Sequence, residues 1–110
     1  MLVRNREQVE PVTYKGEAKG VEMRPLITER EGAPNFAMRV FNLTAEGHTP
    51  YHAHDWEHEV YIISGTGMVR SNEGERLLRP GDSVFVAPLE EHQFCAGAGG
   101  LQFICCVPNT

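Results

Sequence analysis

The stretch that decides the fold is Gly47-His48-Thr49-Pro50-Tyr51-His52-Ala53-His54-Asp55-Trp56-Glu57-His58, which holds four of the five histidines of the chain. On a strand, residues two apart point to one face, so His52 and His54 can present their imidazoles to a single ion. His58 has the same parity. Imidazole is a ligand for zinc, copper, iron and nickel. The triplet therefore predicts a metal site, whereas His48 is interpreted as a surface or hydrogen-bonded histidine.

Short β-type runs, separated by turn signals, surround this stretch. They fall at residues 21–27, 36–43, 60–63, 68–71, 83–87 and 101–107. Glycine, proline and asparagine mark turns between them at 31–35, 72–74, 80–82 and 96–100. Many short strands joined by such turns predict an all-β antiparallel sandwich or barrel and disfavour alternating βαβ units.

The length of 110 residues allows one hydrophobic core, so we expect one structural domain. Within it, residues 1–35 are predicted to be an N-terminal arm and first strands that pack on the barrel. Residues 36–110 are predicted to be the barrel itself. The first twenty residues are polar, and they form either a loose arm or one short strand around residues 9–14.

Composition disfavours several classes of partner. Ten Lys and Arg stand against fifteen Asp and Glu, for a net charge of −5, and the basic residues are scattered, which disfavours nucleic-acid binding. No apolar run is long enough for a membrane helix, and no signal peptide is apparent, so we expect a cytoplasmic protein. Cys95, Cys105 and Cys106 are a poor disulfide framework and are read as reduced thiols.

Two motifs resemble those of the cupin family. The first is Gly47-x(4)-His52-x-His54-x(3)-His58-x(6)-Gly65, and the second, downstream of a hairpin, is Gly81-Asp82-x(5)-Pro88-x(3)-His92-x-Phe94. The similarity covers about residues 36–107. It implies the cupin double-stranded β-helix, a jelly-roll-like antiparallel barrel with a metal inside.

The resemblance also implies a ligand set. His52, His54 and His92 match the family's histidines directly. The remaining position is Glu59 if it is counted forward from His54, and His58 if it is counted back from Gly65. Strand parity offers a test: an inward His58 turns Tyr61 outward, whereas an inward Glu59 points Tyr61 into the barrel. Both faces are plausible from the sequence. The sequence is similar to a branch of small cupins with four histidines, so we favour His58.

Four further residues are candidates for roles beside the metal. Phe94 shares the face of His92 and is expected to wall the cavity. Trp56 lies in a bend between ligands and either covers the mouth of the barrel or supports the loop. Arg39 could anchor a substrate carboxylate from inside, although an outward cation is commoner on a strand. One of the adjacent thiols is expected to point inward; if it is Cys106, that thiol could lie near the metal, although plain packing is favoured.

The family resemblance leads to the functional prediction. We expect one divalent transition metal, with Mn or Fe favoured and Zn, Ni or Cu as alternatives. An octahedral ion with four imidazoles keeps two open positions, where Mn or Fe could bind dioxygen beside a substrate. Many cupins are dioxygenases, so the resemblance implies a dioxygenase-like oxidoreductase acting on a small organic substrate in the barrel. The alternatives are a non-redox isomerase or lyase, a binding or sensing protein without turnover, and a purely structural zinc. Small cupins commonly pair through their sheets, so a homodimer is expected.

Overall fold

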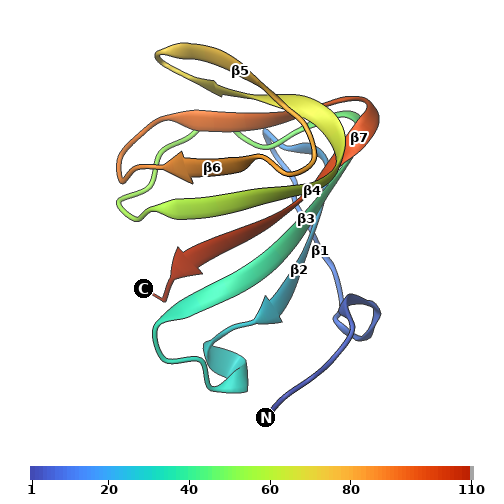
Figure 1. Cartoon of the computed structure of the whole chain (residues 1–110), viewed down its shortest axis with the longest axis vertical. Coiled ribbons are helices and arrows are strands. Elements are labelled where there is room, and N and C mark those ends of the chain that lie inside the picture. The colour runs from blue at the N-terminus through green and yellow to red at the C-terminus, as the bar shows by residue number, and fades with distance from the viewer. Residues whose placement is uncertain (110) are drawn as a thin grey trace.

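The computed structural model describes residues 1–109, and nearly all of its regular structure is β (Figure 1). Two single-turn 3₁₀ helices, η1 (Arg6–Gln8) and η2 (Glu29–Glu31), lie in the N-terminal third. Its strands are β1 (Val12–Thr13), β2 (Lys19–Ile27), β3 (Phe36–His48), β4 (His58–Ser71), β5 (Gly74–Leu78), β6 (Ser83–Val86) and β7 (His92–Pro108). The all-β prediction is confirmed.

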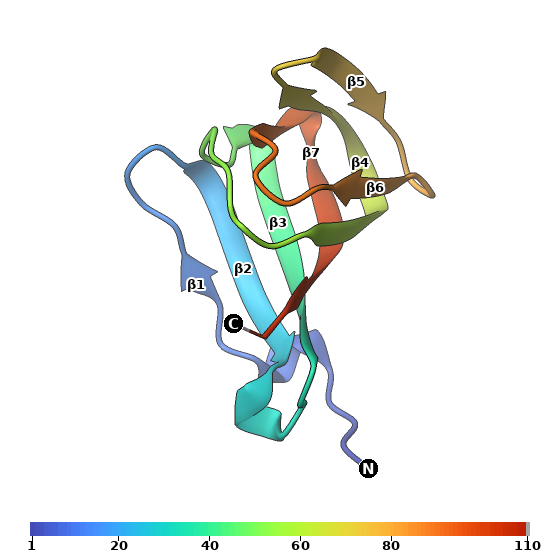
Figure 2. The same ribbon diagram turned by 90° about the vertical axis from the view of Figure 1, so that its left-hand side faces the viewer.

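All strand pairs are antiparallel, in the order β1-β2-β3-β7-β4-β5, with β6 also paired to β4. Figure 2 shows β1, β2, β3 and β7 side by side, and both β5 and β6 pair with β4. The last strand therefore lies in the middle of the sheet, between β3 and β4. This arrangement brings residues near position 92 against residues near position 52.

The two longest strands, β4 and β7, extend beyond the strands predicted from the sequence. Residues 60–63 and 68–71 are parts of one strand, β4, and the glycine-rich segment at 96–100 lies inside β7. Both strands bend where their pairing register shifts, and Gly65 and Gly100 adopt positive φ angles of 84° and 82° there. A side chain at Gly65 would collide with the carbonyl of Gly100. Glycine thus allows each strand to continue through a bend, and in β7 this bend takes the place of the turn predicted at 96–100.

The predicted hairpin at 72–74 is present, since Ser71 pairs with Gly74. Strand β5 that follows it was not predicted, because its residues are mostly charged or exposed. The Pro80-Gly81-Asp82 turn is tied to the barrel: the Asp82 carboxylate accepts from the Arg79 amide at 2.9 Å, and Ile62 exchanges backbone hydrogen bonds with this turn. This turn leads the chain into β6 and on to the second motif.

The core lies inside the barrel and draws on most of its strands. Leu43, Ile62 and Leu101 are almost fully buried, and the Phe41 and Phe103 rings stack with centroids 5.1 Å apart. Burying each such side chain contributes about 1.5–3 kcal/mol. Among residues 1–109, no helix has the length and apolar character needed to cross a membrane.

Candidate metal centre

The two motifs are joined through their backbones. The His52 amide donates to the His92 carbonyl at 3.1 Å, and the His92 amide donates to the His52 carbonyl at 2.9 Å. This isolated bridge fixes the segment between β3 and β4 against the first residue of β7. Two residues forty positions apart in sequence are thus directly opposite each other, with their side chains on the same side.

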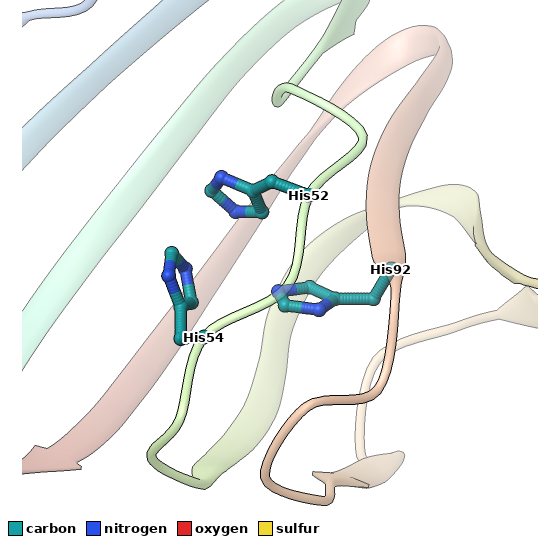
Figure 3. Close-up of side chains that lie close together, drawn as sticks. All are labelled: His52, His54 and His92. Atoms are coloured by element: carbon teal, nitrogen blue, oxygen red, sulfur yellow. The ribbon is translucent and has the colours of Figure 1, made fainter.

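Three imidazoles converge in front of this bridge (Figure 3). The rings of His52 and His54 lie 4.1 Å apart between centroids, and the ring of His92 lies 5.0 Å from that of His52. One ring nitrogen from each residue lies within 4.8 Å of the other two. Nitrogens bound to one ion at about 2.1 Å are at most about 4.2 Å apart, so small side-chain rotations bring these three into bonding range.

His58 begins β4 and turns toward the same space. Its ring centroid lies 5.0 Å from that of His92 and 5.1 Å from that of His54, outside the tightest cluster of three. The side chain is 7% exposed, and Val60 and Ile62 are buried on its face while Tyr61 is 52% exposed. Glu59 points outward. Strand parity thus gives the inner position to His58 rather than to Glu59.

The histidines have the chemistry that a divalent ion needs. Nε2 of His58 is buried and has no hydrogen-bond partner, while its Nδ1 lies 3.2 Å from Cys105 Sγ. Burial, followed by the neighbouring histidines, lowers the pKa of His52 to about 4. Burial, followed by His92, Arg39 and the other histidines, lowers the pKa of His58 to about 3. Both rings are therefore neutral near pH 7 and have a free lone pair, and an ion would supply the missing partner of Nε2.

Comparison with known families agrees with this arrangement. The family model described as "Cupin domain" matches residues 39–107, from β3 to the end of β7. The chain belongs to the cupin family. None of the curated protein sequences matches this cupin. The match includes both histidine motifs, so the recognition and the double-stranded β-helix fold predicted from sequence are confirmed.

Several solved structures superpose closely on it. The polyketide cyclase RemF from Streptomyces resistomycificus has a TM-score of 0.91 and 29% identity, over 98% of this chain and 79% of that chain. A cupin-2 domain protein from Rhodospirillum rubrum has a TM-score of 0.88 and 24% identity, over 99% and 75%. A cupin 2 conserved barrel domain protein from Rhodopseudomonas palustris has a TM-score of 0.82 and 27% identity, over 93% and 71%.

The histidines of this cupin open onto a cavity of about 270 Å³ with largely aromatic walls. The aromatic residues that line it are Tyr14, Phe41, Trp56, Phe94 and Phe103. Phe94 lies where the sequence placed it, buried and on the face of His92. Trp56 stacks flat on His54, with centroids 4.5 Å apart and an angle of 5° between the planes. It therefore forms part of the cavity wall and also restrains one imidazole.

The structure corrects two expectations, one for the adjacent cysteines of β7 and one for Arg39 on β3. Cys105, which is 2% exposed, is the inward thiol and contacts His58; Cys106 turns to the other side of β7 and borders an outer pocket with Glu59. The reason is the alternation of β7, which buries Leu101, Phe103 and Cys105 together. The expectation that Arg39 faces outward is also wrong, since its guanidinium lines the cavity.

Two further residues, Tyr14 and His48, differ in their position relative to the cavity. Tyr14, just after β1, reaches the cavity and packs edge-on against Phe41 with centroids 5.9 Å apart; burial raises the pKa of its phenol. Nothing in the polar N-terminal sequence signals this contact. His48 lies away from the cavity, with Nδ1 3.3 Å from Gln93 Nε2, so the fifth histidine is indeed a hydrogen-bonded residue.

Proposed function

We propose that this cupin is a metal-dependent enzyme in which His52, His54, His58 and His92 hold one divalent transition metal. The observation that carries the proposal is the convergence of four imidazoles on one cavity, where one ring has a buried nitrogen without a partner. Mn or Fe is the favoured ion, and Zn, Ni and Cu bind the same donors. The cavity in front of the histidines provides room for a substrate, which a purely structural metal does not need.

The substrate we propose is a small, largely flat organic molecule with a carbonyl or enol oxygen. A bound divalent ion supplies Lewis-acid polarisation of such an oxygen or, when it is redox active, activation of dioxygen. Phe94, Phe103 and Trp56 offer apolar faces that orient a flat body and displace water from around it. The 29% identity to a polyketide cyclase supports carbonyl chemistry without net oxidation, as in a cyclase, isomerase or lyase.

The dioxygenase-like oxidoreductase predicted from the sequence is the second candidate. The observation that favours it is the histidine cluster, because histidine nitrogens bind Mn and Fe, which are redox active. Oxygen uptake separates the two candidates. A cyclase, isomerase or lyase turns over its substrate at the same rate with and without dioxygen, whereas a dioxygenase consumes one dioxygen per turnover.

Metal analysis of the purified protein tests the shared part of the proposal. We expect about one transition-metal ion per chain in the wild type, and loss of most of it in His54→Ala, because one inner ligand is removed. His48→Ala is the matched control, since this histidine lies outside the cavity and leaves metal content unchanged. Full metal occupancy in His54→Ala, or a wild type that takes up no metal, would contradict the proposal.

A homodimer and a cytoplasmic location remain proposals as well. Tyr61 and Phe85 are 52% and 63% exposed on the outer face of the β4–β6 pair, where apolar side chains favour association. A second copy of this chain is the partner we propose for that face. Light scattering at micromolar concentration is expected to give twice the chain mass, and a monomer mass would contradict the dimer.

A further inference from the structure

Arg39 places a guanidinium at the cavity where no acidic group balances it. Its Nη2 donates to Cys105 Sγ at 3.2 Å, and its guanidinium carbon lies 5.1 Å from the centre of the Phe41 ring. Its Nε is buried and has no hydrogen-bond partner. The three ion pairs found within residues 1–109 all join other side chains. The groups beside this positive charge are therefore a thiol and an aromatic ring.

The rest of the cavity adds no negative charge. Of the described residues that line it, none is Asp or Glu. A charged group in an apolar, partly closed space is costly unless it is paired. A divalent ion held by the histidines would add two more positive charges to the same space. An anionic guest is thus the occupant that relieves this imbalance most effectively.

We propose that Arg39 binds the carboxylate of the substrate, so that this cavity selects small planar organic carboxylates. The inference rests on the proposed function for the chemistry at the metal end and adds the charge of the substrate at the Arg39 end. A guanidinium matches a carboxylate in shape and donor geometry. The contacts with Cys105 and Phe41 hold it in one orientation, which reduces the entropy lost on binding.

Binding of benzoate and benzamide to the purified, metal-containing protein tests this assignment. The two probes share size and shape and differ in charge. We expect benzoate to bind about 10- to 100-fold more tightly by calorimetry, the range of a hydrogen bond to a charged group. Quenching of Trp56, the only tryptophan in the chain, reports that the probe lies in the cavity. Equal affinity for the two probes, or no binding of benzoate, would overturn the proposal.

Two variants show whether Arg39 is the source of the preference. Arg39→Met is expected to reduce the ratio of affinities to about one, and Arg39→Lys to keep part of it, since the charge remains without the planar fork. Arg76→Met is the matched control, because Arg76 is exposed on β5 and does not line the cavity. A full preference retained in Arg39→Met contradicts the proposal. Should that variant not fold, the ratio in Arg39→Lys decides the matter, because the proposed metal is the same there as in the wild type; an unchanged ratio in Arg39→Lys would contradict the proposal.

Metal content, measured in each sample, separates this inference from the proposed function. A protein that takes up no metal yet prefers benzoate through Arg39 refutes the metal-dependent enzyme and keeps the anion site. A protein with one metal per chain and no preference for benzoate refutes the anion site and keeps the metal centre.

Discussion

His58 gives a quantitative prediction for the metal-free protein, because its ring is buried, unpaired at Nε2 and hard to protonate in the fold. Its pKa falls from 6.5 to about 3, with burial as the main cause. Below pH 6.5 this histidine is therefore protonated in the unfolded chain, whereas in the folded chain it stays neutral down to about pH 3. Stability from this group is complete above pH 6.5 and is lost progressively down to about pH 3. Each pH unit in that window costs about 1.4 kcal/mol, so at about pH 5 the loss is about 2 kcal/mol.

Urea unfolding of chelator-treated protein at about pH 7.5 and about pH 5 measures this loss, with His58→Gln as the comparison. Other titrating groups contribute to both proteins and cancel in the difference. We expect the wild type to lose about 2 kcal/mol more than His58→Gln between the two pH values. His48→Gln is the control, since His48 lies outside the histidine cluster, and it should lose as much as the wild type. Equal losses in the wild type and His58→Gln would refute the reasoning.

Three further substitutions test other parts of the site and fold. Cys105→Ala removes the thiol beside His58 Nδ1, which we expect to hold this ring in place for the metal, and should weaken metal binding about 10-fold. Cys106→Ala is the control and should leave metal binding unchanged. Chelator competition measures both affinities, and equal effects would contradict this role of Cys105. Gly65→Ala should lower the free energy of unfolding, measured in urea, by about 2 kcal/mol or more, because φ is positive there and the new methyl group would collide with the Gly100 carbonyl. Gly99→Ala is the control and should be nearly neutral, because open space surrounds that position. A neutral Gly65→Ala would contradict the strand bend. Glu59→Ala should leave metal content unchanged, and a large loss would favour the rejected ligand.

The division of charge in the cavity follows from the kind of residues that line it. Histidines with lowered pKa values supply neutral donors, so any positive charge at the metal end comes from the ion. Arg39 adds a fixed positive charge at another point of the wall. Under the two proposals made above, a substrate with an oxygen for the metal and a carboxylate for the guanidinium would be held at both points. This two-point binding is how so small a barrel could orient a reaction.

The sequence alone determined the fold class and most of the histidine cluster, because both depend on the local spacing of residues. His52 and His54 are two apart on an extended segment, and turn residues delimit the strands, so neither inference requires knowledge of distant contacts. The hairpin at residues 72–74 was found for the same reason. His92 was added through the order of the two motifs, and the backbone bridge to His52 provides its physical basis.

Only the tertiary structure decided which face of each strand meets the cavity. Parity leaves His58 and Glu59, or Cys105 and Cys106, as equal alternatives until one face is buried against other strands. Arg39 faces inward because β3 pairs with β7 in a register that sets it opposite Cys105. Tyr14 reaches the cavity from the polar N-terminal segment, whose sequence does not show which side chain enters the barrel. These positions depend on long-range pairing, which no local window of sequence contains.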